Sequence, residues 1–82
     1  MNKALDSLLS DIVLCKYWTE YSEDYLDGLK DAYWLITGKR PGVCIKNDDT
    51  FTVNFKYGKS KERRYGKIVY HEDTHTVEAV LI

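Results

Sequence analysis

Residues 51–57 read Phe51-Thr52-Val53-Asn54-Phe55-Lys56-Tyr57, so that an apolar or aromatic side chain occupies every second position. Strict alternation of this kind is typical of a β-strand that buries one face and exposes the other. Because successive side chains of a strand point to opposite sides, Phe51, Val53 and Phe55 share one face. The stretch therefore predicts a half-buried strand and a sheet that is covered on one side.

The segments on both sides of this strand favour further strands. Upstream, residues 43–45 are expected to form a short strand, and residues 47–49 favour a turn. Downstream, a polar and basic loop is expected over residues 58–64, a strand over 65–70 and a last strand over 76–82. Because the connections are short, we expect an antiparallel meander of three to four strands.

The N-terminal part of the chain has helical periodicity. One stripe of residues predicts a helix over about 3–17, namely Leu5, Leu8, Leu9, Ile12 and Cys15. Ser22 is a predicted N-cap and Gly38 a predicted left-handed C-cap, so a second helix should span about residues 22–37. Its expected apolar stripe is Leu26, Leu29, Tyr33 and Ile36. We also expect Gly28 to mark a close approach of the two helices and Trp34 to lie in the core.

Together these elements predict one α+β domain over residues 1–82, with two N-terminal helices packed on a three- to four-stranded antiparallel meander sheet. No apolar run is long enough to span a membrane, and the N-terminus lacks the features of a signal peptide. We therefore expect a cytoplasmic protein. Cys15 and Cys44 are expected to be reduced, packed thiols, because a secreted domain of this size usually carries more cysteines.

The string His71-Glu72-Asp73-Thr74-His75 matches H-E-x-x-H, the motif of zinc peptidases. That chemistry requires a helix, which places both histidines on one face, and a third protein ligand. The flanking residues 67–70 and 76–80 alternate like strands, and the chain has two histidines in all. We therefore expect a hairpin turn centred on residues 73–74, with no metal, cofactor or catalytic residue. A chance metal site that uses both histidines across the turn is the alternative.

Basic residues concentrate in the middle of the chain, where nine of its twelve Lys and Arg residues lie between positions 39 and 67. The densest part, residues 56–67, includes two tyrosines and resembles a basic hairpin that could follow a phosphate backbone and stack on unpaired bases. The predicted nucleic-acid-binding residues are Lys56, Lys59, Lys61, Arg63, Arg64, Tyr65 and Lys67. Arg63 and Arg64 are expected to act as paired phosphate-binding forks. The alternative is a solvated loop whose charges keep a sheet edge soluble.

The two helices carry acidic residues close to aromatic ones, which is typical of a protein-binding surface. The predicted protein-binding residues are Tyr17, Trp18, Tyr21, Glu23, Asp24 and Asp27. In the alternative interpretation, one or both of the aromatics cap the core where the helices turn. The C-terminal Val80-Leu81-Ile82, without a polar tail, is a candidate edge for self-association, so we expect a homodimer or higher homo-oligomer.

The segments Tyr25-Leu26-Asp27-Gly28-Leu29-Lys30-Asp31-Ala32-Tyr33 and Ile36-Thr37-Gly38-Lys39 resemble the small, Tyr-rich, acidic accessory proteins of tailed bacteriophages. Many such proteins block host defences or redirect host machinery, so the resemblance implies a non-enzymatic factor that acts in the host cytoplasm. The function expected first is a regulatory protein that binds RNA, or an RNA-bound target, through the basic hairpin. The alternative is a stoichiometric inhibitor of a host or defence enzyme that acts through the acidic helical face.

Overall fold

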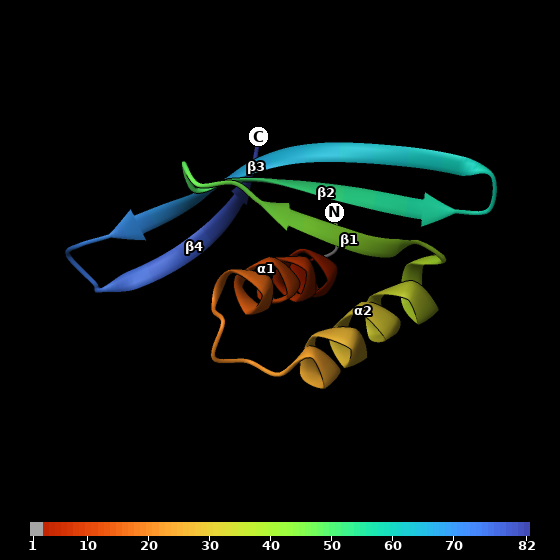
Figure 1. Ribbon diagram of the computed structural model, residues 1–82, viewed down its shortest axis with the longest axis horizontal. Coiled ribbons are helices and arrows are strands. Elements are labelled where there is room, and N and C mark those ends of the chain that lie inside the picture. Colours follow the sequence, from red (N-terminus) through yellow and green to blue (C-terminus); the bar gives the residue numbers. More distant parts are fainter. Residues whose placement is uncertain (1–2) are drawn as a thin grey trace.

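The computed structural model describes residues 3–82. The elements, in chain order, are α1 (Lys3–Tyr17), α2 (Glu23–Thr37), β1 (Arg40–Ile45), β2 (Thr50–Tyr57), β3 (Ser60–His71) and β4 (Thr76–Leu81). The four strands pair antiparallel in the order β1-β2-β3-β4, and both helices lie on one side of the sheet (Figure 1). The predicted α+β fold is confirmed, with four strands in the meander.

The predicted caps of the second helix are confirmed by hydrogen bonds. The Ser22 side chain accepts a hydrogen bond from the backbone N–H of Tyr25 at 3.2 Å. At the other end, Gly38 has a φ of 74°, and its N–H donates to the carbonyl oxygen of Trp34 at 2.7 Å. Glycine adopts this left-handed conformation without the steric cost that other residues meet. Local sequence therefore sets both ends of α2.

α1 packs on the sheet, and α2 packs on α1 and on the β1 edge of the sheet. One buried cluster joins α1 to the inner face of the sheet and consists of Leu9, Val13, Phe51, Val53, Phe55 and Ile68. A second cluster joins the two helices and consists of Ile12, Cys15 and Leu26. The alternation in β2 thus buries Phe51, Val53 and Phe55 as predicted. No helix or strand of residues 3–82 covers the opposite face of the sheet (Figure 1).

The core requires a glycine in β3. Gly66 is the direct partner of Phe51 across the β2–β3 ladder, and a Cβ added at Gly66 would overlap the Phe51 ring. The Phe51 ring fills the space that a side chain at position 66 would occupy. Gly66 is therefore a packing requirement of the inner face rather than a turn signal.

Two strands are longer than the sequence pattern predicts. β3 begins at Ser60 rather than at residue 65, and a turn of two residues, Gly58 and Lys59, joins it to β2. The expected loop over residues 58–64 is thus mostly strand. The side chains of this segment alternate between the two faces, but the sequence shows no alternation of polarity, because charged residues occupy inward as well as outward positions. β1 begins at Arg40 and includes Pro41, which an edge strand tolerates because part of its backbone has no ladder partner.

Four packing expectations are wrong, and three of them concern α2, which packs on α1 and β1 and reaches β2 through the stacking of Tyr33 on Phe55. Trp34 is 50% exposed and Ile36 is 64% exposed, since the C-terminal turns of α2 extend beyond α1. Gly28 has no neighbouring atom within reach of an added Cβ, so it marks no close helix contact. Both cysteines are free, but only Cys15 is buried; Cys44 points outward from β1 and is exposed.

Candidate nucleic-acid interface

The basic segment of β3 is divided between the two faces of the sheet. Across the β2–β3 ladder, Arg64 is the direct partner of Val53, which is fully buried, so Arg64 points toward the helices. Arg63 is the partner of Asn54 and points away from them. Directly opposed residues of an antiparallel pair share a face. The expected pair of phosphate-binding forks therefore does not exist, because the two arginines lie on opposite sides.

Arg64 belongs to an ionic cluster on the inner face. Its Nε donates to Oε1 of Glu62 at 2.8 Å, and Nζ of Lys39 donates to Oε2 of the same carboxylate at 3.1 Å. Lys39 also lies over the ring of Tyr57, with its Nζ 5.1 Å from the centroid. The hydrogen bonds from Arg64 and Lys39 lower the pKa of Glu62. Because the charge of Arg64 is compensated within the fold, we leave this residue out of the candidate interface.

The remaining basic residues of β2 and β3 gather on the face that the helices leave free. We define the outer basic face by Lys56, Lys61, Arg63, Tyr65 and Lys67. Within residues 3–82, none of its four cations forms an ion pair with a carboxylate; Arg63 donates only to the neutral Oδ1 of Asn54, at 2.7 Å. Tyr65, 55% exposed, lies among them in β3.

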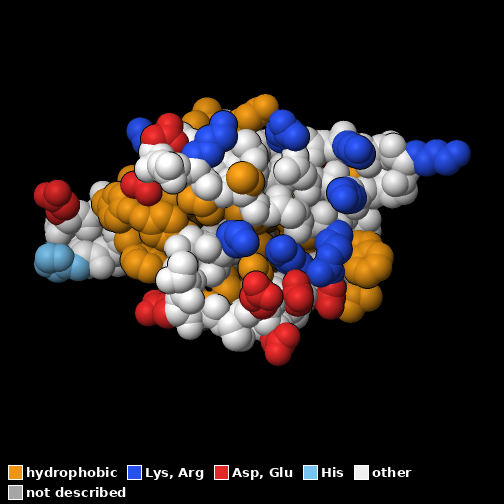
Figure 2. Space-filling model, viewed as in Figure 1, with side chains coloured by type: hydrophobic (Ala, Val, Ile, Leu, Met, Phe, Trp, Pro, Cys, Tyr) orange, Lys and Arg blue, Asp and Glu red, His pale blue; other side chains and the backbone are white. Residues whose placement is uncertain are grey.

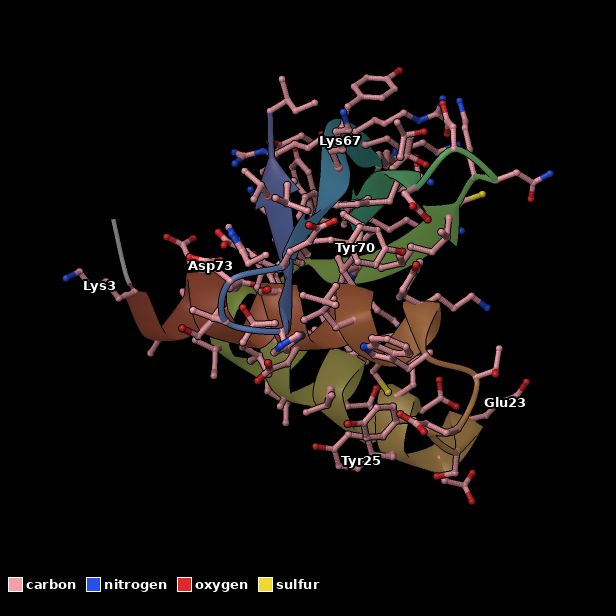
Figure 3. The ribbon with its side chains drawn as sticks, turned by 90° about the vertical axis from the view of Figure 1, so that its left-hand side faces the viewer. Lys3, Glu23, Tyr25, Lys67, Tyr70 and Asp73 are labelled. Carbon is pink, nitrogen blue, oxygen red and sulfur yellow. The ribbon has the colours of Figure 1, made fainter. Side chains whose placement is uncertain are left out.

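No Asp or Glu shares the outer side of β1, β2 and β3 with the outer basic face, because Glu62 of β3 points inward. In the register of β1 to β3, the outward positions hold no Asp or Glu, and the outward acid of β4, Glu78, pairs with His71 at 2.7 Å. Lys59, in the turn between β2 and β3, extends the positive charge to the tip of the hairpin. Figure 2 shows Lys and Arg side chains over the sheet and its right-hand end, and acidic side chains along the lower margin formed by α2. In Figure 3, Lys67 lies on the side away from the helices and Tyr70 on the helix side.

The H-E-x-x-H string forms the hairpin that the sequence predicts. His71 ends β3 and pairs with Thr76 at the start of β4, so residues 72–75 make the turn. His75 adopts a left-handed φ of 54°, a conformation found in turns. No group of three or more His, Cys, Asp or Glu side chains in the described part of the chain is arranged to hold a metal. The helix that zinc peptidase chemistry requires is absent from these residues.

The aromatic residues at the corner between α1 and α2 differ in their surroundings. Tyr17 is half-buried against the core, and its Oη donates to Oδ1 of Asp49 at 3.3 Å and contacts Oη of Tyr70. The hydrogen bond with Tyr17 raises the pKa of Tyr70. Tyr17 thus joins α1 to the sheet, which agrees with the core-capping alternative. Trp18 packs edge-on against the Tyr17 ring but keeps a substantial exposed surface.

The other predicted protein-binding residues lie at the start of α2. Tyr21 and Tyr25 are both exposed and stack with centroids 5.6 Å apart. Glu23 and Asp24 occupy the first turn and make no ion pair within residues 3–82. Asp27 differs, because its Oδ1 lies 3.7 Å from NH2 of Arg40. The surface formed by Trp18, Tyr21, Glu23, Asp24 and Tyr25 is called the acidic aromatic corner below.

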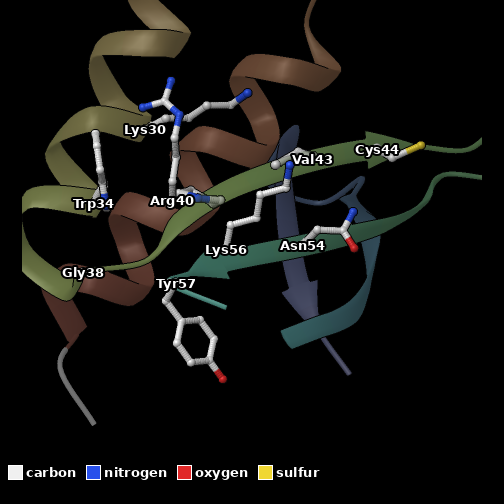
Figure 4. A pocket seen from close by; sticks show the side chains of 12 residues that line it. Lys30, Trp34, Gly38, Arg40, Val43, Cys44, Asn54, Lys56 and Tyr57 are labelled. Atoms are coloured by element: carbon white, nitrogen blue, oxygen red, sulfur yellow. The ribbon is translucent and has the colours of Figure 1, made fainter. Parts of the chain in front are cut away.

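Sequence reasoning missed a pocket at the β1 edge of the sheet. The edge pocket has a volume of about 620 Å³, and its lining includes Lys30, Trp34, Arg40, Gly42, Asn54 and Lys56 (Figure 4). Its residues come from α2, β1, β2 and the turns after α2 and β2, and the packing of α2 on β1 brings them together. No local motif in the sequence signals it.

Comparison of the chain with protein-family models, curated proteins and solved structures finds no match. The resemblance to accessory proteins of tailed phages therefore stays a prediction. Neither helix of the described residues, at 15 residues each, has the length and apolar character needed to cross a membrane.

Proposed function

We propose that this protein is a non-catalytic binding protein that engages single-stranded nucleic acid, RNA in the first place, through the outer basic face. The observation that carries the proposal is the set of four cations on adjacent strands without a carboxylate partner within residues 3–82. Each phosphate that a Lys or Arg neutralises releases counterions, which favours binding at low and moderate salt. Binding that covers a nucleic-acid strand without chemically altering it would give the protein a regulatory role.

A single strand fits this face better than a duplex. The exposed side of α2 is acidic, and α1 carries as many acids as lysines. Both helices lie on the opposite side of the sheet from the outer basic face, so neither serves as a recognition helix for a major groove. The exposed ring of Tyr65 stands among the cations and offers a platform on which an unpaired base can stack. Arg63 and Lys67 lie two residues before and two residues after Tyr65 in β3, so all three side chains share one face. The two cations can therefore contact the phosphates on either side of a base that stacks on Tyr65.

The test is binding of a labelled, unstructured oligonucleotide by fluorescence anisotropy across a range of salt concentrations. We expect the affinity of the wild-type protein to fall with salt, with a slope of about 0.7 per neutralised phosphate. Lys61→Glu/Arg63→Glu should abolish binding at low salt. The matched control is Lys3→Glu/Lys16→Glu, which makes the same change of net charge on exposed positions of α1. The absence of wild-type binding at low salt, or an equal loss in both variants, would contradict the proposal.

A second candidate function is stoichiometric inhibition of a host or defence enzyme by the acidic aromatic corner. The observation in its favour is the pair of stacked, exposed tyrosines beside two carboxylates that have no ion pair within residues 3–82. Tyr and Trp side chains are common anchors of protein interfaces, and carboxylates around them would match a basic site on the partner. In the test, purified protein captures partners from the natural host. A partner lost with Tyr21→Ala/Tyr25→Ala and kept with Lys61→Glu/Arg63→Glu would favour this candidate over nucleic-acid binding.

We also propose self-association through β4. This strand ends the sheet order, and Val80, Leu81 and Ile82 are exposed. An unpaired edge with apolar side chains is a site where a second copy can add its own strand. Light scattering after size exclusion should give a dimer mass, and Val80→Lys should shift it to a monomer. A wild-type monomer at high concentration would exclude this mode.

A further inference from the structure

The edge pocket is large enough for a small ligand, and its charged lining residues are all positive. Its volume of about 620 Å³ lies within the range typical of small-molecule pockets. Lys30, Arg40 and Lys56 line it, and no Asp or Glu among residues 3–82 does. Figure 4 shows these three side chains over the same hollow, between α2 and the first two strands. The pocket is therefore suited to an anion.

Its cations are in two different states. Arg40 is held by ion pairs to Asp27 and Asp31 of α2, and its guanidinium lies over the Trp34 ring, 5.9 Å from the centroid. Lys30 and Lys56 have no ion pair within residues 3–82. Two unpaired ammonium groups balance an anion of charge near −2. A phosphate monoester has a charge of about −1.5 to −2 at pH 7, whereas a phosphodiester inside a strand carries about −1.

The walls of the pocket also offer contacts to an aromatic base. Trp34 is half exposed although it is the kind of residue that usually packs in a core. Its indole lines the pocket beside Arg40, where a base can stack. Asn54 uses Oδ1 to accept from Arg63, which leaves its amide hydrogens to donate to a ligand. Phosphate and base contacts are thus close together in one pocket.

Gly42 keeps the pocket open without being required by the fold. A Cβ added there would meet only the backbone oxygen of Asn54, at an ordinary distance of 3.8 Å, and its backbone is not in the left-handed region. A residue with a side chain would therefore fit the strand, but the side chain would enter the pocket that Gly42 lines. A substitution at Gly42 can therefore fill the pocket while leaving the fold intact, so the two can be tested separately.

We propose that the edge pocket binds a nucleotide by its terminal phosphate monoester, held by Lys30 and Lys56, with the base against Trp34. The monoester can belong to a free mononucleotide or to the phosphorylated end of a strand. In the second case the pocket extends the outer basic face, with which it shares Lys56, and that case rests on the proposed function. The first case is independent of it.

The first experiment titrates AMP and adenosine against the protein and follows Trp34 fluorescence in a Trp18→Phe background, where Trp34 is the remaining tryptophan. We expect AMP to quench Trp34 and adenosine to bind at least about 10-fold more weakly, because it lacks the charge-assisted hydrogen bonds of the phosphate. Gly42→Leu and Lys30→Gln should each weaken AMP binding about 10-fold or more. The control Lys16→Gln, on the exposed side of α1, should bind like the parent protein. Equal affinities for AMP and adenosine, or a folded Gly42→Leu that binds AMP normally, would overturn the proposal for a free nucleotide.

The second experiment compares one oligonucleotide in 5′-phosphorylated, 3′-phosphorylated and unphosphorylated forms. A preference for a phosphorylated end that Gly42→Leu removes identifies the strand end as the source of the monoester, and AMP binding without such a preference identifies the free nucleotide. If neither AMP nor a phosphorylated end is preferred, the pocket proposal fails. Salt-dependent binding of the unphosphorylated strand, lost in Lys61→Glu/Arg63→Glu, would then still support the proposed function.

Discussion

Arg63 and Arg64 are adjacent in the sequence but serve opposite faces of β3. The inward Arg64 is compensated by Glu62, which also binds Lys39, close to the ring of Tyr57. The outward Arg63 has only the neutral Asn54 as a partner. The side chain of Arg64 is 56% exposed, so what distinguishes it from Arg63 is its ion pair with Glu62 and not burial. A basic run in a strand thus contains two sets of residues, because side chains alternate between the faces: one set is paired within the fold, and the other is free to bind.

The largest expected effect concerns the two strand glycines, one on each face. Gly66→Ala places a methyl group where the Phe51 ring lies, so it should cost about 1–3 kcal/mol of unfolding free energy, as overpacked cores do. Gly42→Ala meets no close neighbour and should change stability by less than about 0.5 kcal/mol. Urea denaturation of both variants measures the difference. Similar losses at both positions would mean that the faces do not differ in packing as described.

The two tyrosines of β3 also lie on opposite faces, so substituting each of them tests which face binds nucleic acid. Tyr65→Ala on the outer face should weaken single-strand binding by about 1–3 kcal/mol, because it removes a stacking platform. Tyr70→Ala on the helix side removes the contact with Tyr17 instead and should leave affinity unchanged in the folded protein. Anisotropy titrations at one fixed salt concentration distinguish the two. If Tyr70→Ala weakened binding as much as Tyr65→Ala, the outer basic face would not be the binding surface.

The sequence predicts an element well where one physical signal dominates it. The helical stripe and the caps fix α1 and α2, and the alternation over residues 51–57 fixes β2. β3 is predicted too short because Glu62 and Arg64 occupy inward positions, so polarity does not alternate although the side chains do. The register with β2 determines which of the two arginines faces outward. The composition of the segment carries no information about that register. The edge pocket depends on how α2 packs on β1, and no local pattern encodes that packing.

A smaller effect is expected from neutralising each arginine singly. Arg63→Gln should lower the salt slope of single-strand binding by about 0.7, the contribution of one phosphate contact, and leave stability unchanged. Arg64→Gln should leave the slope unchanged and cause a small loss of stability, because it removes one partner of Glu62. Titrations at four or more salt concentrations, with urea denaturation alongside, measure both quantities. An equal reduction of slope in the two variants would show that both arginines reach the nucleic acid.

The smallest effect concerns the inner ionic cluster and pH. The hydrogen bonds from Arg64 and Lys39 lower the pKa of Glu62 below its ordinary value of 4.5, so the folded protein releases this proton more readily than the unfolded chain. The resulting stabilisation is present above pH 4.5 and is lost as the pH falls through the lowered pKa of the folded state. Glu62→Gln removes this contribution, so its stability should differ from that of the wild type at pH 7 and converge with it under acid conditions. Glu72→Gln, in the β3–β4 turn and outside the inner ionic cluster, makes the same change of side chain and is the matched control. A gap between wild type and Glu62→Gln that stayed constant down to low pH would show that the carboxylate of Glu62 is not held by these two cations.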